Sequence, residues 1–424
     1  MSEVLRIDGI AAGGAGVGRG SDGRAVFVHR TAPGELVRIR RIEEKKRWAR
    51  GEVLEVLEPS ASRRSAPCRF YDRCGGCTLE HLQYDAQLAA KAQIVTDAFQ
   101  RIGHLDIPVP DVVASPQEFR ARNRVSFTLL RLRDGRVVAG FHEIHRPDRV
   151  LDVDASCLMP EQAVADAWAA LRASWGPEAN RLPSGTRLRL TLRASESGTV
   201  GLLVQGGFGA GRADDLLAAV PALESVWHQP RATGDAVLLA GSPFLSEDWA
   251  DEELALSGAV FLQVNRAAAA MLEDHVMTLL GDDLAGRHVV DAYCGVGIHA
   301  RRLARRGARV TGIESNAAAV ADARNAVPAG TFLAGRVEDE LAAVLPADVV
   351  IVNPPRAGLD PAVTEVLTGG RPRRIVYVSC DPATLARDVA RLAPVFALRS
   401  IRCFDLFPQT AHVETVVDLT CSIT

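Results

Sequence analysis

The sequence contains no apolar run that approaches the length of a membrane-spanning helix. Its first six residues lack the basic start and apolar core of a secretory signal peptide. We therefore expect a cytoplasmic protein with no membrane partner. A disulfide framework is not expected either, because the 8 cysteines are unevenly spaced in a long chain without a signal. Metal binding or catalysis is the favoured use of these cysteines.

The chain also lacks a large net charge, since its formal value is -3 at pH 7. Basic residues are nevertheless uneven: residues 1–50 carry eleven Lys or Arg against six Asp or Glu, and arginines crowd residues 120–136. Such faces fit contacts with nucleic-acid phosphates, although charge alone is equally compatible with ordinary solvated surface. At 424 residues the chain should form two or three domains, and we expect a monomer.

The most informative stretch surrounds Cys380. Residues 375–378 are β-branched or aromatic and predict a short buried strand, and residues 383–392 predict a helix. Asp381 is placed to cap that helix, and Pro382 suits its first turn. Cys380 would then lie at the C-terminal end of a parallel strand, where ligands bind in open α/β sheets. It would also lie beside a helix N-terminus, which lowers the pKa of a thiol. For a lone cysteine, a structural role would be favoured.

Residues 1–58 contain short apolar segments punctuated by glycine, at 4–10, 25–29, 36–41 and 51–57. This spacing predicts a small antiparallel β-barrel of the OB-like type, a fold that can bind single strands through a basic groove. The glycine-rich residues 13–20 should form turns rather than a dinucleotide-binding loop, because no helix follows them. Residues 59–65 are typical of a linker.

Residues 59–250 should form a β-rich domain with a four-cysteine site. Helices are predicted at 88–102 and 161–173, a hairpin turning at Asp134-Gly135, and further strands at 186–193 and 200–205. Three cysteines form a C-x5-C-x2-C pattern and a fourth follows eighty residues later: Cys68, Cys74, Cys77 and Cys157. Four thiolates could hold tetrahedral zinc or an iron–sulfur cluster, and the spacing does not choose between them.

Residues 251–424 alternate strands and helices, which predicts a Rossmann-like, doubly wound parallel sheet of the α/β class. A strand at 287–291 leads into a loop containing Gly295 and Gly297, and the next strand, 308–313, ends at Glu314. Glycines let the backbone approach an adenosine-containing ligand, and the carboxylate accepts from ribose hydroxyls. The single short loop favours S-adenosylmethionine over a dinucleotide.

Together these segments resemble the RNA uracil-5-methyltransferase family, specifically its ribosomal-RNA branch with an N-terminal TRAM domain. The motifs that carry the resemblance follow one another in the family's order: the four cysteines, Phe261-Leu262-Gln263-Val264-Asn265, Asp291-Ala292-Tyr293-Cys294-Gly295-Val296-Gly297, Asn353-Pro354-Pro355-Arg356-Ala357-Gly358-Leu359, Ser379-Cys380-Asp381-Pro382-Ala383-Thr384 and Asp405-Leu406-Phe407-Pro408-Gln409-Thr410-Ala411-His412-Val413-Glu414.

The resemblance implies methylation of carbon 5 of a uridine in 23S ribosomal RNA, with Cys380 as the nucleophile and Glu414 as the base. It implies a [4Fe-4S] cluster rather than zinc at the four cysteines. The expected contacts with S-adenosylmethionine come from Gln263, Tyr293, Gly295, Glu314 and Asn353. For His412, a role in packing is at least as well supported as one in catalysis. Cys294, Cys403 and Cys421 are expected to be structural.

One residue departs from the pattern, because the family often has Asp where this chain has Asn353. The lost charge puts in doubt what this position contributes, although an amide still donates and accepts hydrogen bonds. The same reaction on transfer RNA is the close alternative. Asn353-Pro354-Pro355 also suggests amino-group methylation, but those enzymes typically have an aromatic residue where this chain has Arg356. An RNA-binding protein with an inactive methyltransferase fold would be expected to have lost the nucleophile or the base.

Overall fold

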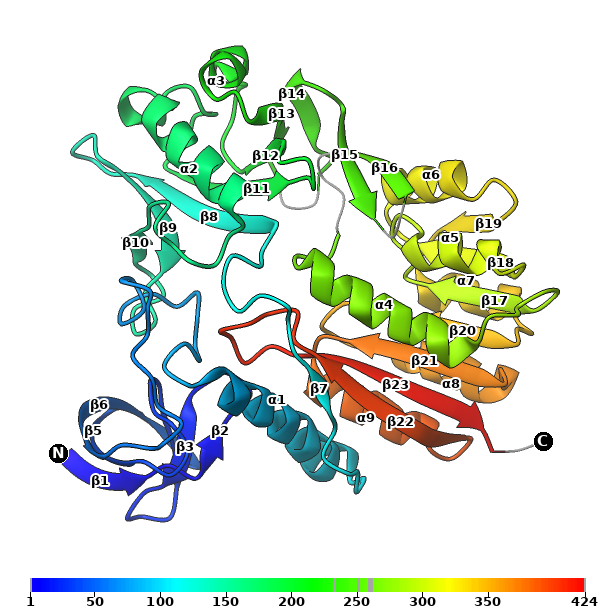
Figure 1. Ribbon diagram of the computed structural model, residues 1–424, viewed down its shortest axis with the longest axis horizontal. Coiled ribbons are helices and arrows are strands. Elements are labelled where there is room, and N and C mark those ends of the chain that lie inside the picture. Colours follow the sequence, from blue (N-terminus) through cyan, green and yellow to red (C-terminus); the bar gives the residue numbers. More distant parts are fainter. Residues whose placement is uncertain (1, 232–233, 250–251, 258–261, 423–424) are drawn as a thin grey trace.

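The computed structural model describes residues 2–231, 234–249, 252–257 and 262–422, and Figure 1 shows how they are arranged. The first 58 residues form a six-stranded sheet of order β1-β5-β6-β4-β3-β2. Its strands are β1 (Ser2–Arg6), β2 (Gly9–Ile10), β3 (Gly16–Arg19), β4 (Ala25–Val28), β5 (Leu36–Glu44) and β6 (Trp48–Glu58). Alternate residues such as Val26 and Val28, or Val37 and Ile39, point into one apolar core. The glycine-rich residues form the predicted turn only in their first part; Gly16–Arg19 form strand β3, so the prediction of turns is wrong there. A Cβ at Gly18 would lie 2.0 Å from the carbonyl oxygen of Arg6.

The cysteine-bearing segment leads into α1 (Tyr84–Ala98), a π-helical turn η1 (Phe99–Gly103) and the short strand β7 (Val112–Val113). The predicted helix is confirmed, with its start four residues earlier than expected. Val95 and Phe99 pack in the core of the C-terminal sheet. β7 pairs with β22 of that sheet. This early part of the chain therefore completes a sheet formed by the last part (Figure 1).

The central region is a seven-stranded sheet of order β10-β9-β8-β11-β12-β13-β14. It consists of β8 (Arg124–Arg131), β9 (Val137–His142), β10 (Val150–Asp152), β11 (Arg187–Ala194), β12 (Val200–Gln205), β13 (Leu223–Gln229) and β14 (Val237–Gly241), with α2 (Gln162–Ser174), η2 (Pro177–Ala179) and α3 (Ala213–Ala219). The predicted hairpin is confirmed, with Arg131 paired to Val137 and Gly135 at φ +81°. Trp168 of α2 stacks on Phe127 at 4.0 Å, which covers one face of the sheet. A two-stranded ribbon, β15 (Phe244–Trp249) and β16 (Glu252–Ser257), follows.

The C-terminal sheet has eight strands in the order β19-β18-β17-β20-β21-β23-β22-β7. Besides β7 its strands are β17 (His288–Ala292), β18 (Arg309–Glu314), β19 (Thr331–Ala334), β20 (Val349–Val352), β21 (Arg374–Ser379), β22 (Phe396–Phe404) and β23 (Glu414–Cys421). The strands from β17 to β21 are parallel, but β23 runs antiparallel to both β21 and β22. The prediction of a parallel sheet is therefore wrong for its last part. The reason is that β22 and β23 are joined by a loop without a crossover helix, so the chain must reverse.

Helices cover both faces of this sheet, which confirms the doubly wound arrangement (Figure 1). The helices are α4 (Arg266–Leu280), α5 (Ile298–Arg305), α6 (Ala317–Ala326), α7 (Val337–Val344), α8 (Pro361–Gly370) and α9 (Pro382–Leu392). α4, α5 and α6 contribute to the apolar cluster on one face, and α1, α7, α8 and α9 to that on the other. Among the described residues, no helix is both long and apolar enough to cross a bilayer.

Candidate active site

The predicted catalytic and cofactor residues that follow residue 250 all line one cavity of about 1340 Å³. They are Gln263, Tyr293, Gly295, Glu314, Asn353, Cys380 and Glu414. Most of them follow the C-terminal ends of parallel strands, where the side chains of an open α/β sheet meet. The sequence motifs, separated by up to 150 residues, therefore converge on one place.

Cys380 follows β21 directly and is half-buried. The Asp381 carboxylate accepts hydrogen bonds from the backbone N–H groups of Ala383 and Thr384, both at 3.0 Å, and Pro382 is the first residue of α9. The predicted strand, cap and helix are therefore confirmed. They fix Cys380 in a tight turn at the cavity wall.

Glu414 lies beside Cys380 because β23 runs antiparallel to β21. Ser379, the last residue of β21, pairs with Thr415, so Cys380 and Glu414 are the next residues along the same two strands. Burial raises the pKa of Glu414 to about 7, against the opposing effect of the Arg356 guanidinium. A carboxyl group with this pKa exchanges its proton near neutral pH, as a general base must.

The expected lowering of the thiol pKa at Cys380 is wrong. Burial raises the pKa of Cys380, the nearby Glu414 carboxylate raises it further, and Arg356 lowers it in part through a hydrogen bond and its charge. The desolvation of this half-buried thiol is the largest influence on its pKa. The thiolate in this site depends on Arg356.

Arg356 is a residue whose role the sequence motifs did not reveal. It follows Asn353-Pro354-Pro355 after β20, lines the cavity, and influences both Cys380 and Glu414. In the sequence, the place of Arg356 after Asn353-Pro354-Pro355 indicates only that amino-group methylation is disfavoured. The signal that could have identified it was its place after a parallel strand, next to the strand that ends at Cys380.

His412 is not suited to proton transfer at neutral pH. Burial and the nearby cations, among them Arg356, lower the pKa of His412 to about 4. Its ring contacts that of Phe407 edge-on at 5.8 Å. The structure therefore supports the packing role.

The loop after β17 is shaped to accept a ligand. Tyr293 has φ 66°, an uncommon left-handed conformation for a residue other than glycine, and Gly295 has φ 54°. No atom lies within 4 Å of a Cβ built at Gly295, whereas one built at Gly297 would lie 3.1 Å from Ala323 of α6. Gly295 thus leaves space in the cavity, and Gly297 allows close packing.

The acid at the end of β18 is held against this loop. The Gly295 N–H donates to Glu314 Oε2 at 3.3 Å, and the Asn316 N–H donates to Glu314 Oε1 at 2.7 Å. These bonds orient the carboxylate at the cavity wall, where it can accept hydroxyl donors.

Gln263 and Asn353 complete the set. The Gln263 carbonyl oxygen accepts from Asn123 Nδ2 at 3.3 Å, which ties this segment to the central sheet. The Asn353 N–H donates to the carbonyl oxygen of Ala292 at 3.4 Å, next to the glycine loop. Phe261, which begins the Gln263 motif, lies outside the described residues.

The central sheet supplies a basic wall, formed in part by the arginine-rich residues 120–136 noted in the sequence. Arg124 and Ser126 of β8 and Arg189 of β11 line the cavity from the face opposite α2. Arg122, just before β8, lies over the ring of Phe407 with its guanidinium carbon 5.4 Å from the ring centre. An anionic, planar ligand would find both charge and stacking surface here.

The four predicted metal ligands line a second, small cavity together. Burial raises the pKa of all four thiols, most strongly that of Cys77 and, to about 12, that of Cys157. Across the described ranges, no group of three or more His, Cys, Asp or Glu side chains is placed so that it could hold a metal ion. The four cysteines therefore lie around one cavity, but they are not arranged as a metal-binding group, and the cluster itself stays a prediction.

Arg30 of the N-terminal sheet fastens the cysteine-bearing segment. Its guanidinium donates to the carbonyl oxygens of Cys77 at 2.9 Å, Cys74 at 2.7 Å and Tyr71. It also lies 3.4 Å from the centre of the Tyr71 ring. The N-terminal sheet and the cysteine site therefore share one rigid contact.

Comparisons with known proteins agree with this architecture. A family model described as tRNA (Uracil-5-)-methyltransferase matches residues 336–421, which contain Asn353, Cys380 and Glu414. An uncharacterized RNA methyltransferase of Thermosynechococcus vestitus is 37% identical, over 99% of this chain and 98% of its own length. A second one, from Gloeobacter violaceus, is 35% identical over 98% and 96% of the two chains.

A solved structure shows the same similarity in three dimensions. The tRNA (uracil-54, C5)-methyltransferase of Pyrococcus abyssi, crystallised with S-adenosyl-L-homocysteine, has a TM-score of 0.76 and 28% sequence identity. The match covers 99% of this chain and 100% of that one. The similarity thus includes all three sheets and not only the C-terminal one.

Proposed function

The chain belongs to the RNA uracil-5-methyltransferase family, and from this we propose that it methylates carbon 5 of a specific uridine in 23S ribosomal RNA through a covalent cysteine–uracil intermediate. The observation that carries the proposal is the placement of Cys380 and Glu414 on adjacent antiparallel strands in the cavity that also holds the glycine loop.

The chemistry requires a nucleophile because carbon 5 of uracil is too weakly nucleophilic to take a methyl group unaided. The Cys380 thiolate adds to carbon 6, and the ring becomes an enolate that is reactive at carbon 5. Arg356 favours the thiolate through its charge and hydrogen bond. When bound, S-adenosylmethionine supplies the electrophilic methyl group and leaves as S-adenosylhomocysteine.

Glu414 then completes the reaction. Its carboxylate removes the proton from carbon 5, the double bond between carbons 5 and 6 re-forms, and the thiolate of Cys380 is expelled. A pKa of about 7 lets this carboxyl group accept the proton and later release it to solvent.

The donor would lie along the loop after β17. Glu314 is oriented to accept the ribose hydroxyls, Gly295 leaves room for the ligand, and Gln263, Tyr293 and Asn353 complete its surroundings. A carboxamide at Asn353 would hold the donor by hydrogen bonds in place of the charge that Asp would supply.

The RNA would approach through the basic wall of the central sheet, and its target base must leave its stack to reach Cys380. We assign the N-terminal sheet as the TRAM module that contributes backbone contacts. The four cysteines, which share one enclosed cavity, would hold a [4Fe-4S] cluster. Such a cluster would act as a structural staple, because methyl transfer needs no electron.

Transfer RNA is the second candidate substrate. The names of the matching family model and of the Pyrococcus abyssi enzyme both refer to tRNA. The four-cysteine site together with the N-terminal sheet favours the ribosomal alternative through the resemblance described above.

Mapping of 5-methyluridine in both RNA classes tests the proposal. A strain lacking this gene should lose one 5-methyluridine from 23S ribosomal RNA, and the wild-type gene should restore it. Loss of a 5-methyluridine from transfer RNA alone would establish the second candidate. Unchanged 5-methyluridine in both classes would contradict the proposed function.

A further inference from the structure

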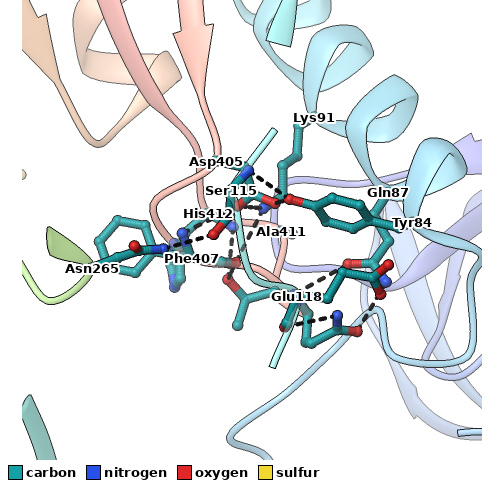
Figure 2. Close-up of polar contacts among 12 residues, drawn as sticks. Tyr84, Gln87, Lys91, Ser115, Glu118, Asn265, Asp405, Phe407, Ala411 and His412 are labelled. Carbon is teal, nitrogen blue, oxygen red and sulfur yellow. Dashed lines mark hydrogen bonds and ion pairs between the residues drawn. The ribbon is translucent and has the colours of Figure 1, made fainter. Parts of the chain in front are cut away.

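α1 has a polar stripe that is buried instead of facing solvent. Tyr84, Gln87 and Lys91 are spaced three and four residues apart, so they lie on one side of the helix. Gln87 and Lys91 are both 0% exposed. All three reach toward the loop of residues 405–413, which joins β22 to β23 and ends immediately before Glu414 (Figure 2).

Lys91 and Asp405 form the centre of this contact. Their side chains make an ion pair in which both partners are 0% exposed. The Lys91 ammonium also donates to the carbonyl oxygen of Phe407 at 3.1 Å, and the Phe407 N–H donates to Asp405 Oδ1 at 3.1 Å. The pair therefore fixes the loop at the residue whose ring forms part of the cavity wall.

A second grip lies further along the loop. The side-chain amide of Gln87 donates to Gln409 Oε1 at 2.9 Å, and its carbonyl accepts from the Gln409 N–H at 3.1 Å. Gln409 has φ 68°, so this backbone conformation is held by its contacts. The loop is thus fastened to α1 at two points before it reaches the base.

A branch of the same network leads to the cofactor side. Tyr84 donates to Asp405 Oδ2 at 2.9 Å and accepts from the Ser115 N–H at 2.8 Å. The Ser115 hydroxyl in turn accepts from Asn265 Nδ2 at 2.9 Å (Figure 2). Asn265 caps α4 through Ala268 and lies two residues after Gln263.

We propose that α1 is a positioning element for catalysis: the Lys91–Asp405 pair places Glu414, and Tyr84 links that placement to the segment carrying Gln263. The inference rests on the proposed function. These are positioning residues, since they act through the loop and through Asn265 and do not line the cavity.

The alternative is that the pair only stabilises the fold. A buried ion pair is a poor device for that purpose, because well-packed apolar residues in its place are often equally or more stabilising. The charged pair can fix the loop of residues 405–413 in one conformation through directional hydrogen bonds, which an apolar pair cannot do. This difference separates the two roles experimentally.

The test uses the double substitution Lys91→Met/Asp405→Leu, which removes both charges together. Release of the thiolate requires Glu414, whereas addition of Cys380 does not. We therefore expect the folded variant to form the methylated covalent adduct with RNA but to release product at least tenfold more slowly. The adduct should accumulate on denaturing gels, as it should for Glu414→Gln, and the dependence of release on pH near 7 should shift.

A matched control replaces a partly exposed ion pair at the C-terminal end of the same helix, between Asp97 of α1 and Arg101 of η1: Asp97→Asn/Arg101→Gln. It should leave product release within twofold of the wild-type rate. A folded double variant of the buried pair that also releases product within twofold, without adduct, would overturn the inference. If the wild-type protein makes no 5-methyluridine at all, the proposed function fails and the inference falls with it.

Tyr84→Phe provides a variant that removes a single hydroxyl and keeps the ion pair. It should slow product release about threefold and raise the KM for S-adenosylmethionine about threefold, because both ends of the link are loosened. Tyr84 does not line the cavity where RNA and S-adenosylmethionine would bind. If Tyr84→Phe leaves both the rate of product release and the KM for S-adenosylmethionine unchanged, the proposed link through Tyr84 is contradicted, even if the double variant fails to fold.

Discussion

The negative charges of the Cys380 thiolate and the Glu414 carboxylate repel each other, so the protonation state of each group affects the pKa of the other. The Glu414 carboxylate raises the pKa of Cys380, while Arg356 favours the charged form of both groups. A protonated Glu414 therefore makes the thiolate easier to form, and in the proposed mechanism Glu414 has just taken up a proton when the thiolate is expelled. The two groups titrate as a coupled pair whose states suit successive steps.

Substitution of the nucleophile should separate binding from chemistry. Cys380→Ala removes the sulfur that attacks carbon 6, so we expect no detectable methylation while S-adenosylmethionine binds with its wild-type affinity. Isothermal titration and methyl incorporation measure the two quantities. Cys421→Ala, a partly exposed cysteine outside the cavity, serves as the control and should keep full activity. Activity in Cys380→Ala would refute covalent catalysis.

The pH dependence should report Glu414. The base must be unprotonated, and its pKa is about 7, so kcat should fall as pH drops below 7, about tenfold between the plateau and pH 6. The raised pKa of Cys380 has the same sign, because more thiolate forms as pH rises. A rate measured from pH 5.5 to 9 checks this. A rate that is flat from pH 6 to 8 would show that Glu414 does not limit turnover.

For single residues, the sequence predicts those features that depend on residues nearby in the chain. The strand, cap and helix around Cys380 follow from Asp381 and Pro382, whose effects are local. The pKa of Cys380 could not be predicted, because it depends on burial and on Arg356 and Glu414, which reach it through the tertiary structure. Arg356 was missed for the same reason.

The element that decides the site is β23. Because it inserts antiparallel between β21 and β22, its first residue, Glu414, lies beside Cys380, the residue that follows β21. The alternation of strands and helices predicts a parallel sheet, but it predicts neither β19 nor this insertion. The missing helix between β22 and β23 was a signal that the chain reverses there. The buried polar stripe of α1 gave none, since polar residues on a helix ordinarily face solvent.

Gly295, in the loop between β17 and α5, and Gly23, in the turn between β3 and β4, offer a matched pair of glycine substitutions. Gly295 and Gly23 both have positive φ, and neither has an atom within 4 Å of a built Cβ. Each change to alanine should cost about 1 kcal/mol of stability. Gly295→Ala alone should weaken S-adenosylmethionine binding, by roughly tenfold, because its methyl group enters the cavity. Equal affinity in both variants, measured by titration calorimetry, would place the donor elsewhere.

The whole molecule is joined around the cysteine cavity. Arg30 ties the N-terminal sheet to this segment, and Arg122 lines both the large cavity and a small neighbouring cavity that Cys68, Cys77 and Cys157 also line. The sequence indicated the shared cysteine site through spacing alone. It could not indicate that α1 and β7 join the C-terminal sheet, because a strand of two residues, Val112–Val113, carries no periodic pattern.

The proposed iron–sulfur cluster at the four cysteines can be tested directly. Anaerobically purified protein should be brown and contain about four iron and four sulfide per chain, as a [4Fe-4S] cluster requires. Cys77→Ser should lose both, whereas Cys421→Ser should retain them. Colourless protein with stoichiometric zinc would overturn the assignment.

The long-range pairing of α1 also bears on how the chain is made. Lys91 and Asp405 are 314 residues apart in the sequence. In the same way, β7 cannot pair until its partner strand β22 has been synthesised. A ribosome therefore completes the first helix long before its partners exist. During that interval the ammonium of Lys91 must stay hydrated, because its partner Asp405 has not been synthesised. α1 therefore cannot pack in its final position. The proposed catalytic centre is therefore assembled only near the end of synthesis. We expect incomplete chains to have no methyltransferase activity.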